Sequence, residues 1–334
     1  MSYVARAAGL ALGYAADSVF GDPRRGHPVA GFGWAAAALE RRIWADSRPR
    51  GTAYTLACVA GAIAVGQMAR RAAGPGPLAE TAITAAATWV VLGGRSLAAE
   101  GHVMHTLLAS SDLDGARQRL SHLAGRNPEG LDEGQLARAT VESLAENTSD
   151  AVVAPLLWGA VAGVPGLLGY RAANTLDAMV GHRSARYDRF GWCSARFDDV
   201  ANLAPSRMSA ALAAGAAPLV GGSPMAAVRV WQRDAGKHPS PNAGPVEASF
   251  AGALGVTLGG TNTYGDRVEH RGALGDGPPP RPADIARAVR LSRAVGLASL
   301  VVAGVVTAAI GAATTDRRAR AGKASAKTAR RRRG

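Results

Sequence analysis

The stretch Ala294–Thr315, AVGLASLVVAGVVTAAIGAATT, contains no charged residue over its whole length. About 20 such residues in a helix cross the ~30 Å hydrocarbon core of a bilayer. Five other apolar stretches approach this length, the last two being shorter or carrying charges near their ends: Gly51–Ala69, Ala151–Tyr170, Met208–Val228, Thr81–Gly94 and Val4–Phe20. Any one of them could be a buried helix of a water-soluble protein, but so many in one chain favour a membrane protein. We therefore predict an all-α fold, a polytopic integral protein of the cell membrane that is multi-pass, with about four to six transmembrane or re-entrant helices and long polar loops.

One apolar stretch carries a signal against a simple crossing. Within Ala151–Tyr170 lies the string Gly163-Val164-Pro165-Gly166. Proline lacks a backbone N–H and clashes with the preceding turn, so it breaks or kinks a helix. This segment is therefore predicted to be re-entrant rather than spanning.

Composition agrees with a membrane protein. Aromatic residues make up 5% and charged residues 19% of the chain, and 42 residues are glycine. Alanine and glycine bury little apolar area but allow helices to pack closely in a bilayer. Two cysteines are too few for a disulfide scaffold.

The net charge of +13 is concentrated at the C-terminus. Residues 317–334 carry nine Lys and Arg and no acid, which leaves about +4 (13 − 9) for the rest. Because this basic segment directly follows an apolar stretch, anionic lipid is a better partner for it than nucleic acid. We expect residues 316–334 to be a basic, disordered tail and, by the positive-inside rule, cytoplasmic. If 294–315 crosses once, stretch 229–293 then lies on the opposite side.

The densest polar signal is residues 141–150, VESLAENTSD. In a helix, Glu142, Glu146 and Asp150 recur at i, i+4 and i+8 and share one face. Like charges in a row repel, and a divalent cation would relieve that repulsion. Oxygen ligands of this kind suit Mg²⁺ carrying a nucleotide. The alternative is a solvated acidic face.

A second polar stripe follows at the end of the interrupted apolar stretch. Arg171, Asn174 and Asp177 recur at i+3 beside a predicted membrane boundary, where ionisable groups are costly and usually face a cavity or a partner. Further charged and polar residues follow: Arg183, Arg186, Arg189, Arg196, Asp198, Asp199, Asn202 and Arg207. Arginines bind phosphate or carboxylate through paired hydrogen bonds, or else meet lipid headgroups.

A third cluster is residues 233–244, RDAGKHPSPNAG. Its glycines and prolines predict a loop, on which Lys237, His238, Ser240 and Asn242 offer donors to anionic oxygens. It is not a Walker A loop, because Lys237 is followed by His and the glycine spacing differs. Asn262 and Tyr264 continue the polar character further along the chain.

Together these segments resemble the cobinamide-phosphate synthase family of cobalamin biosynthesis, labelled CobD or CbiB. The matching stretches run nearly through the whole chain: Gly21–Val29, Glu142–Pro155, Arg171–Arg207, Arg233–Gly244, Gly259–Gly265 and Glu269–Arg271. The strings Glu-Asn-Thr-Ser-Asp (146–150) and Gly-Lys-His-Pro-Ser-Pro-Asn-Ala-Gly (236–244) are specific, while the basic tail departs from the family pattern.

The resemblance implies a membrane enzyme that joins (R)-1-amino-2-propanol, or its O-phosphate, to the propionate carboxyl of adenosylcobyric acid. ATP and Mg²⁺ are the implied cofactors, because an amine and a carboxylate do not condense spontaneously in water. The product would be adenosylcobinamide or its phosphate. Residues 1–315 would then form a single membrane-embedded synthase domain, with other membrane enzymes of late cobalamin assembly as partners.

Under this interpretation each polar cluster has an expected role. The metal ligands are Glu142, Glu146 and Asp150, and the catalytic groups are Asp177, Asp199, Lys237 and His238. The expected substrate-binding residues are Asn147, Arg171, Asn174, Arg183, Arg186, Arg207, Ser240, Asn242, Asn262 and Tyr264. Two other interpretations stay open: a membrane transporter of a corrinoid or organic anion, and a membrane sensor or assembly scaffold.

Overall fold

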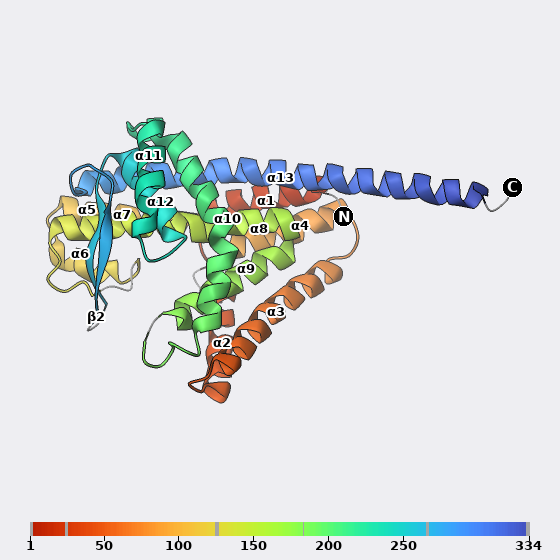
Figure 1. Ribbon diagram of the computed structural model, residues 1–334, viewed down its shortest axis with the longest axis horizontal. Coiled ribbons are helices and arrows are strands. Elements are labelled where there is room, and N and C mark those ends of the chain that lie inside the picture. Colours follow the sequence, from red (N-terminus) through yellow and green to blue (C-terminus); the bar gives the residue numbers. More distant parts are fainter. Residues whose placement is uncertain (1–2, 24–25, 124–126, 183, 265–266, 332–334) are drawn as a thin grey trace.

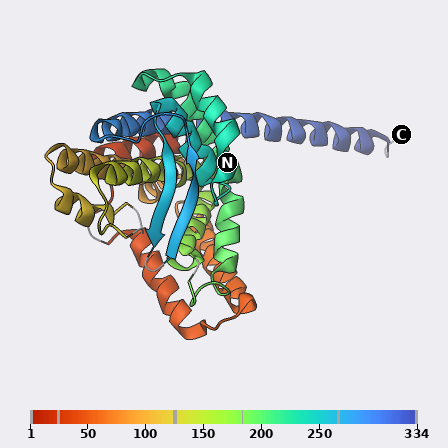
Figure 2. The same ribbon diagram turned by 60° about the vertical axis from the view of Figure 1, so that its left-hand side comes forward.

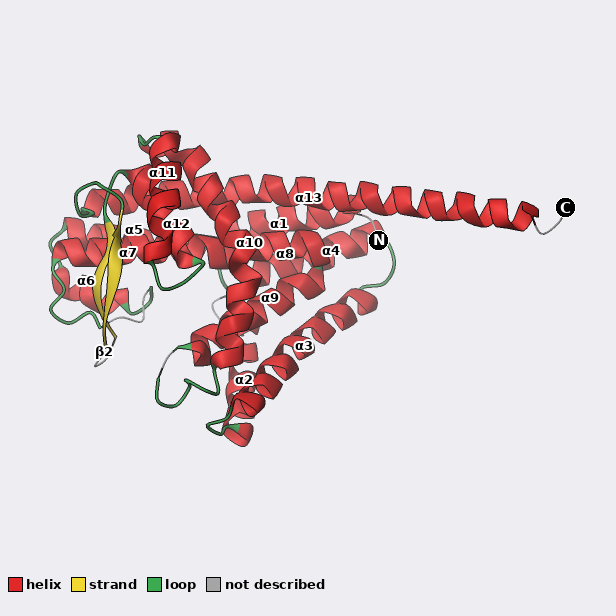
Figure 3. Ribbon diagram, viewed as in Figure 1, coloured by secondary structure: helices red, strands yellow, loops and turns green. Residues whose placement is uncertain are grey.

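The computed structural model describes residues 3–331 apart from 24–25, 124–126, 183 and 265–266 (Figure 1). Most of this is helix (Figure 3). The α-helices are α1 (Tyr3–Phe20), α2 (Pro28–Ile43), α3 (Arg48–Ala72), α4 (Pro77–Val91), α5 (Gly94–Ala109), α6 (Leu113–Leu120), α7 (Glu133–Thr148), α8 (Ala154–Ala162), α9 (Val164–Leu176), α10 (Trp192–Ala216), α11 (Pro224–Asp234), α12 (Ala243–Leu254) and α13 (Pro282–Arg331). The shorter helical elements are η1 (Ser149–Val153), η2 (Asp177–Gly181), η3 (Ala217–Val220) and η4 (Ala235–Lys237). The all-α prediction is confirmed.

One antiparallel β-hairpin is an exception to the all-α architecture. Strand β1 (Leu258–Tyr264) pairs with β2 (Arg267–Leu274), with Gly260 opposite Arg271. The hairpin lies beside α7 and α12 (Figures 1 and 2). The sequence interpretation had placed these residues in a polar loop.

Three segments of the described chain are long and apolar enough to cross a membrane: α3, the α4–α5 segment Pro77–Ala109, and Pro282–Asp316 of α13. The apolar stretch of α13 exposes Leu297, Val301 and Val305, each by more than half. Their spacing of four residues places them on one face of the helix, as expected for side chains that meet lipid. The prediction of a polytopic membrane protein is confirmed.

Two predicted apolar stretches do not form single helices. Ala151–Tyr170 turns back at Gly163, whose φ is +67°, so that α8 and α9 form a hairpin as the Gly-Val-Pro-Gly string predicted. The Arg6 guanidinium caps this turn by donating to the carbonyls of Ala160 and Val161 at 3.1 and 3.3 Å. The prediction of a span over Met208–Val228 is wrong: α10 ends at Ala216, and Pro218 and Gly221 separate it from α11.

Helix α13 connects two packed cores. Its first turns contribute Ile285, Val289 and Val295 to a core with α5, α7 and α12. Further along, Ala303 joins a second core with α1, α4, α8 and α9. The first core and the C-terminal end of α13 lie at opposite ends of the helix (Figure 1). If α13 crosses the membrane once, they face opposite sides of it.

Helix α13 also continues to Arg331, through the segment that was predicted to be a disordered tail. Alanine, arginine and lysine are among the strongest helix formers, and residues 317–331 contain no proline and one glycine. An uninterrupted helix therefore propagates from the apolar stretch into the basic one.

Helices α1 and α4 approach closely through glycine. Gly9 and Gly13 are four residues apart on α1 and face Thr84 and Thr88 of α4. A Cβ at Gly13 would collide with the Thr88 side chain and the Ala85 carbonyl oxygen. Small residues at this spacing let two helices touch backbone to backbone inside a bilayer.

We therefore expect Gly13→Val to destabilise the detergent-solubilised protein by about 1–3 kcal/mol, because α1 must move away from α4. The matched control is Gly304→Val on α13, where an added Cβ meets no atom within 4 Å. Thermal unfolding followed by tryptophan fluorescence should show a lower midpoint for Gly13→Val alone. Equal midpoints for the two variants would contradict this packing.

Candidate active site

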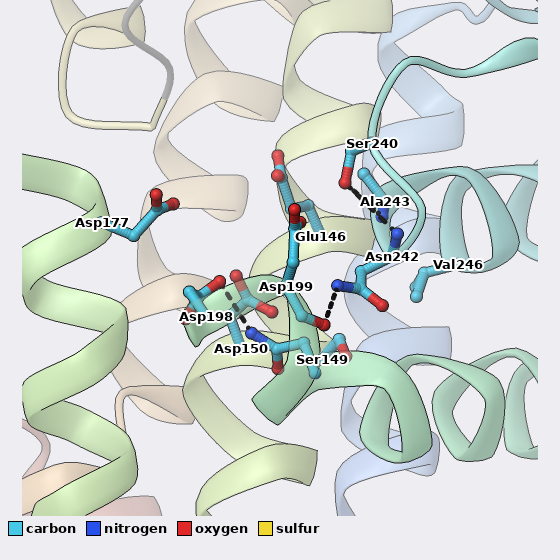
Figure 4. A pocket seen from close by; sticks show the side chains of 11 residues that line it. Glu146, Ser149, Asp150, Asp177, Asp198, Asp199, Ser240, Asn242, Ala243 and Val246 are labelled. Atoms are coloured by element: carbon cyan, nitrogen blue, oxygen red, sulfur yellow. Dashed lines mark hydrogen bonds between the residues drawn. The ribbon is translucent and has the colours of Figure 1, made fainter. Parts of the chain in front are cut away.

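The described chain forms a polar pocket where α7, η1, η2, α10 and the start of α12 meet, with a cavity volume of about 70 Å³ (Figure 4). We call it the acidic pocket, because five of its eleven lining residues are carboxylic acids. The lining residues are Glu146, Ser149, Asp150, Asp177, Asp198, Asp199, Asn202, Ser240, Asn242, Ala243 and Val246. All lie outside the three candidate membrane spans.

Two π-helical turns place carboxylates in this pocket. Asp150 lies in η1 and Asp177 in η2. Pro155, just after η1, has no N–H to offer the carbonyl of Ala151, and the N–H of Gly93 bonds that carbonyl instead at 3.2 Å. At Gly181, a Cβ would overlap the Asp177 carboxylate. Single π-turns are frequent at functional sites, because they change the direction in which a helix presents its side chains.

Helix α10 uses a second proline in the same way. Pro205 lies inside this helix and leaves the carbonyl of Ala201 without its usual donor. The indole Nε1–H of Trp158 on α8 donates to that carbonyl at 3.0 Å. This bond ties α10 to the α8–α9 hairpin next to the turn that carries Asp198 and Asn202.

Amide and phenol groups hold the buried carboxylates in place. The Asn174 side-chain amide donates to Asp150 at 3.3 Å and to Asp198 at 3.5 Å. The Asn202 amide donates to the other oxygen of Asp198 at 2.9 Å and accepts from the Tyr170 hydroxyl at 2.9 Å. These contacts join η1, α9 and α10 through residues that are 24 or more positions apart in sequence.

The carboxyl groups of the pocket resist ionisation. Burial raises the pKa of Asp177 to about 7 and that of Asp198 to about 6, with neighbouring aspartates adding to the shift. Burial, followed by the Asp198 charge, raises the pKa of Asp150 well above its ordinary value. Burial also raises the pKa of Asp199, although Arg196 lies 3.3 Å away. Groups that titrate near neutral pH are suited to accepting a proton from a substrate.

The structure brings several predicted site residues together. Glu146, Asp150, Asp177, Asp199, Ser240 and Asn242 line the pocket. Asn174 bonds to two of its carboxylates, and Arg171 donates to Asn174 at 3.4 Å. Arg207, which is exposed, donates to Asn242 at 2.9 Å, so a guanidinium borders the pocket next to α12.

Glu142 lies elsewhere, although it precedes Glu146 by one helical turn. Its carboxylate is 1% exposed, accepts from the Gly259 N–H at 2.8 Å and lies 3.7 Å from Arg138. It therefore anchors the β-hairpin to α7 and does not line the acidic pocket. The stripe of three acids predicted on one face is divided between two environments.

Lys237 and His238 also face away from the pocket. Lys237 lies 2.6 Å from Asp234, which Arg233 and the Gly275 N–H bind as well. His238 accepts from the Ser240 N–H at 3.0 Å through Nδ1, while its Nε2 lies 3.6 Å from Glu247. These contacts shape the loop that presents Ser240 and Asn242.

Two further predicted residues, Arg186 and Asn147, do not line the pocket. Arg186 pairs with Glu40 at 3.0 Å and stacks over the Trp44 ring at 4.5 Å. Asn147 bonds to Ser143 in its own helix. Arg183 and the side chains of Asn262 and Tyr264 lie outside the described part of the structure.

Five lining residues had no predicted role: Ser149, Asp198, Asn202, Ala243 and Val246. The Asp198–Asn202 pair has a sequence signal, because i and i+4 positions meet on a helix. Ser149 lies inside the Glu-Asn-Thr-Ser-Asp string, in which only Glu146, Asn147 and Asp150 were assigned a role. Val246 had no signal. In the described part of the chain, no three His, Cys, Asp or Glu side chains come close enough together to hold a metal by themselves.

The raised pKa of Asp177 has a consequence for stability. Between its ordinary value of 3.8 and about 7, the folded chain keeps a proton that the unfolded chain has lost. Stability must then fall as pH rises through this window, and the full penalty remains above it. We expect Asp177→Asn to raise the unfolding temperature above that of the unaltered chain, and to raise it by more at about pH 8 than at about pH 4. Both measurements are made in detergent with EDTA. Asp114→Asn, at a side chain that is 86% exposed, should show no such trend. A pH-independent difference for Asp177→Asn would contradict the assignment.

Comparison of the sequence with known proteins finds relatives that match most of the chain. A family model described as CobD/Cbib protein matches residues 10–292. The cobalamin biosynthesis protein CobD of Mycobacterium tuberculosis (strain CDC 1551 / Oshkosh) is 52% identical over 298 residues, which cover 89% of this chain and 95% of that protein. The protein of the same name from Rhodobacter capsulatus is 43% identical over 314 residues, covering 92% and 96%. That from Chromobacterium violaceum is 40% identical over 309 residues, covering 87% and 96%.

No solved structure matches this chain. The matches in sequence extend through all the elements that build the acidic pocket, from α7 to α12. The chain therefore belongs to the CobD/CbiB family of cobalamin biosynthesis proteins.

Proposed function

We propose that this chain is an acid–amine ligase of the cell membrane, crossing it several times. It would join (R)-1-amino-2-propanol or its O-phosphate to the propionate carboxyl of adenosylcobyric acid, giving adenosylcobinamide or its phosphate. The observation that carries the proposal is the acidic pocket, in which burial raises the pKa values of Asp177 and Asp198 to about 7 and about 6, in a chain of this family. Forming an amide from an ammonium ion requires such a base.

The reaction requires two things: activation of the carboxyl group and removal of a proton from the amine. ATP would supply the activation of the carboxyl group, with release of ADP and then of phosphate. The amine nitrogen must lose a proton before it attacks the activated carbonyl carbon. Asp177 or Asp198 accepts this proton, because each is partly ionised near pH 7. Asp199, at the centre of the pocket in Figure 4, is the third candidate.

The donor set of the pocket also fits Mg²⁺ that arrives with a nucleotide. Such Mg²⁺ is typically bound by one or two protein carboxylates together with phosphate oxygens and water. Glu146 and Asp150 are the two carboxylates that α7 and η1 present to the pocket. A cluster of three protein ligands is not needed for this mode of binding.

Size decides which substrate group can enter. A cavity of about 70 Å³ has room for an ammonium group and a few waters, since one water needs about 10–15 Å³ of such volume. The corrinoid and the adenosine of ATP must therefore bind outside it. Arg207, at its border, is placed to neutralise a phosphate there.

The reaction also fixes an orientation. The pocket must face the compartment that contains ATP, the cytoplasm. If α13 crosses the membrane once, its basic end, which lies at the far end of the helix, would then lie on the other side. This reverses the assignment that the positive-inside rule gives to the tail alone.

The direct test uses the detergent-purified chain with adenosylcobyric acid, ATP, Mg²⁺ and each of the two amines. Mass spectrometry should detect the amide product of at least one amine, with stoichiometric ADP. A protein that produces no amide in detergent, but moves a corrinoid across sealed vesicles, would be the transporter instead.

A variant pair on α7 tests the metal assignment. Glu146→Gln should raise the Mg²⁺ concentration for half-maximal rate at least about tenfold, since even outer-shell partners of a metal contribute about 10–100-fold. Glu142→Gln, one turn earlier, keeps an acceptor for the Gly259 N–H and should leave this Mg²⁺ dependence unchanged. If both variants shift it equally, or neither does, Glu146 does not bind the metal.

A further inference from the structure

Ser149 is a buried polar residue of the acidic pocket with an unused hydroxyl. The residue is 2% exposed, and its Oγ has no hydrogen-bond partner among the described residues. Other serines of the neighbouring helix α10 donate to a carbonyl four residues back, Ser206 at 2.7 Å and Ser209 at 2.9 Å. Leaving a hydroxyl buried and unpaired costs free energy, which a bound ligand would recover.

The other neutral polar groups of the pocket are already engaged. Asn202 donates to Asp198 and accepts from Tyr170. Asn242 donates to the Asp199 carbonyl at 2.8 Å and accepts from Arg207. The Ser240 Oγ accepts from the N–H groups of Asn242 and Ala243 at 3.3 and 3.1 Å. A ligand in the pocket therefore meets carboxylate oxygens and the Ser149 hydroxyl.

Charge restricts what this ligand can be. Among the eleven residues that line the pocket, none is Arg, Lys or His, and five are acids. A phosphate or carboxylate would be repelled, while a cation would be attracted. A primary ammonium group has three N–H donors, which matches two carboxylate oxygens and one hydroxyl oxygen.

We propose that Ser149 Oγ, with carboxylate oxygens of the acidic pocket, chiefly those of Asp198, binds the ammonium group of the amine substrate. This inference rests on the proposed function and deepens it by giving the amine a direction. The nitrogen enters the pocket first, and the hydroxyl or phosphate end of the amine points outward to Arg207. Ser149 is then a binding residue, and the base that takes the proton is one of the adjacent carboxylates.

The test is direct binding to the detergent-purified full-length chain by isothermal titration, in the absence of ATP and corrinoid. The probes are 1-amino-2-propanol, 1,2-propanediol and MgCl₂, at about pH 8, where a primary amine is still largely protonated. The unaltered chain should bind the amine and not the uncharged diol. Ser149→Ala should weaken amine binding at least about tenfold, because it removes a hydrogen bond to a charged group.

Two further variants test whether a loss of amine binding is specific to the Ser149 hydroxyl. Ser149→Cys has a similar volume but a weak acceptor, so it should also weaken amine binding. Ser209→Ala removes a buried serine whose hydroxyl bonds only within α10, and it should bind the amine as the unaltered chain does. Mg²⁺ binding should be the same in all four proteins.

The outcomes separate this inference from the proposed function. Amine binding that is unaffected by both Ser149 variants overturns the inference, even if the chain makes the amide. A loss of Mg²⁺ binding without a loss of amine binding also overturns it, because the hydroxyl then serves the metal. Amine binding that depends on Ser149 in a chain that makes no amide supports the inference and refutes the proposed reaction.

Discussion

Burying several carboxyl groups in one small pocket is the constraint on which this structure depends. Asp150, Asp177 and Asp198 repel one another when ionised, and burial alone already disfavours their charged forms. The fold stabilises Asp150 and Asp198 with neutral donors, the amides of Asn174 and Asn202, instead of with cations. The pKa values of all three groups stay raised, whereas an arginine in the pocket would lower them. Asp234 shows the contrast, because Arg233 and Lys237 hold its pKa well below the ordinary range.

The helices around the pocket can be understood as the means of assembling it from distant parts of the chain. The α8–α9 hairpin enters the bundle, turns at Gly163 and returns Tyr170 and Asn174 to the level of Asp150. Two prolines redirect the backbone, and each freed carbonyl finds a donor on another element, Gly93 for Ala151 and Trp158 for Ala201. Leaving a buried carbonyl unpaired costs free energy, so these two bonds determine how α5, α8 and α10 meet.

Local signals in the sequence predicted the helices, the re-entrant turn and the polar stripe that includes Asn174 and Asp177. Those predictions depended on residues within a few turns of one another. The division of Glu142 from Asp150 could not be predicted, because it depends on a hairpin more than 100 residues away that covers Glu142. Likewise, nothing in the sequence joins Asp150 to Asp198 across 48 positions. The hairpin itself had a weak signal in the sequence: the pair Gly265-Asp266, of a type common in two-residue hairpin turns, separates two short strand-like segments. The span expected over Met208–Val228 failed because hydropathy was given more weight than Pro218 and Gly221.

In the proposed reaction, the amine meets the activated carboxyl group in the acidic pocket. A cryo-electron microscopy structure of the chain with adenosylcobyric acid and a non-hydrolysable ATP analogue would test this assignment. We expect one propionate arm of the corrinoid to end at the mouth of the pocket, beside Asp198 and Asp199, with the γ-phosphate next to that carboxyl group. A corrinoid bound with every propionate remote from this pocket would show that the assignment is wrong.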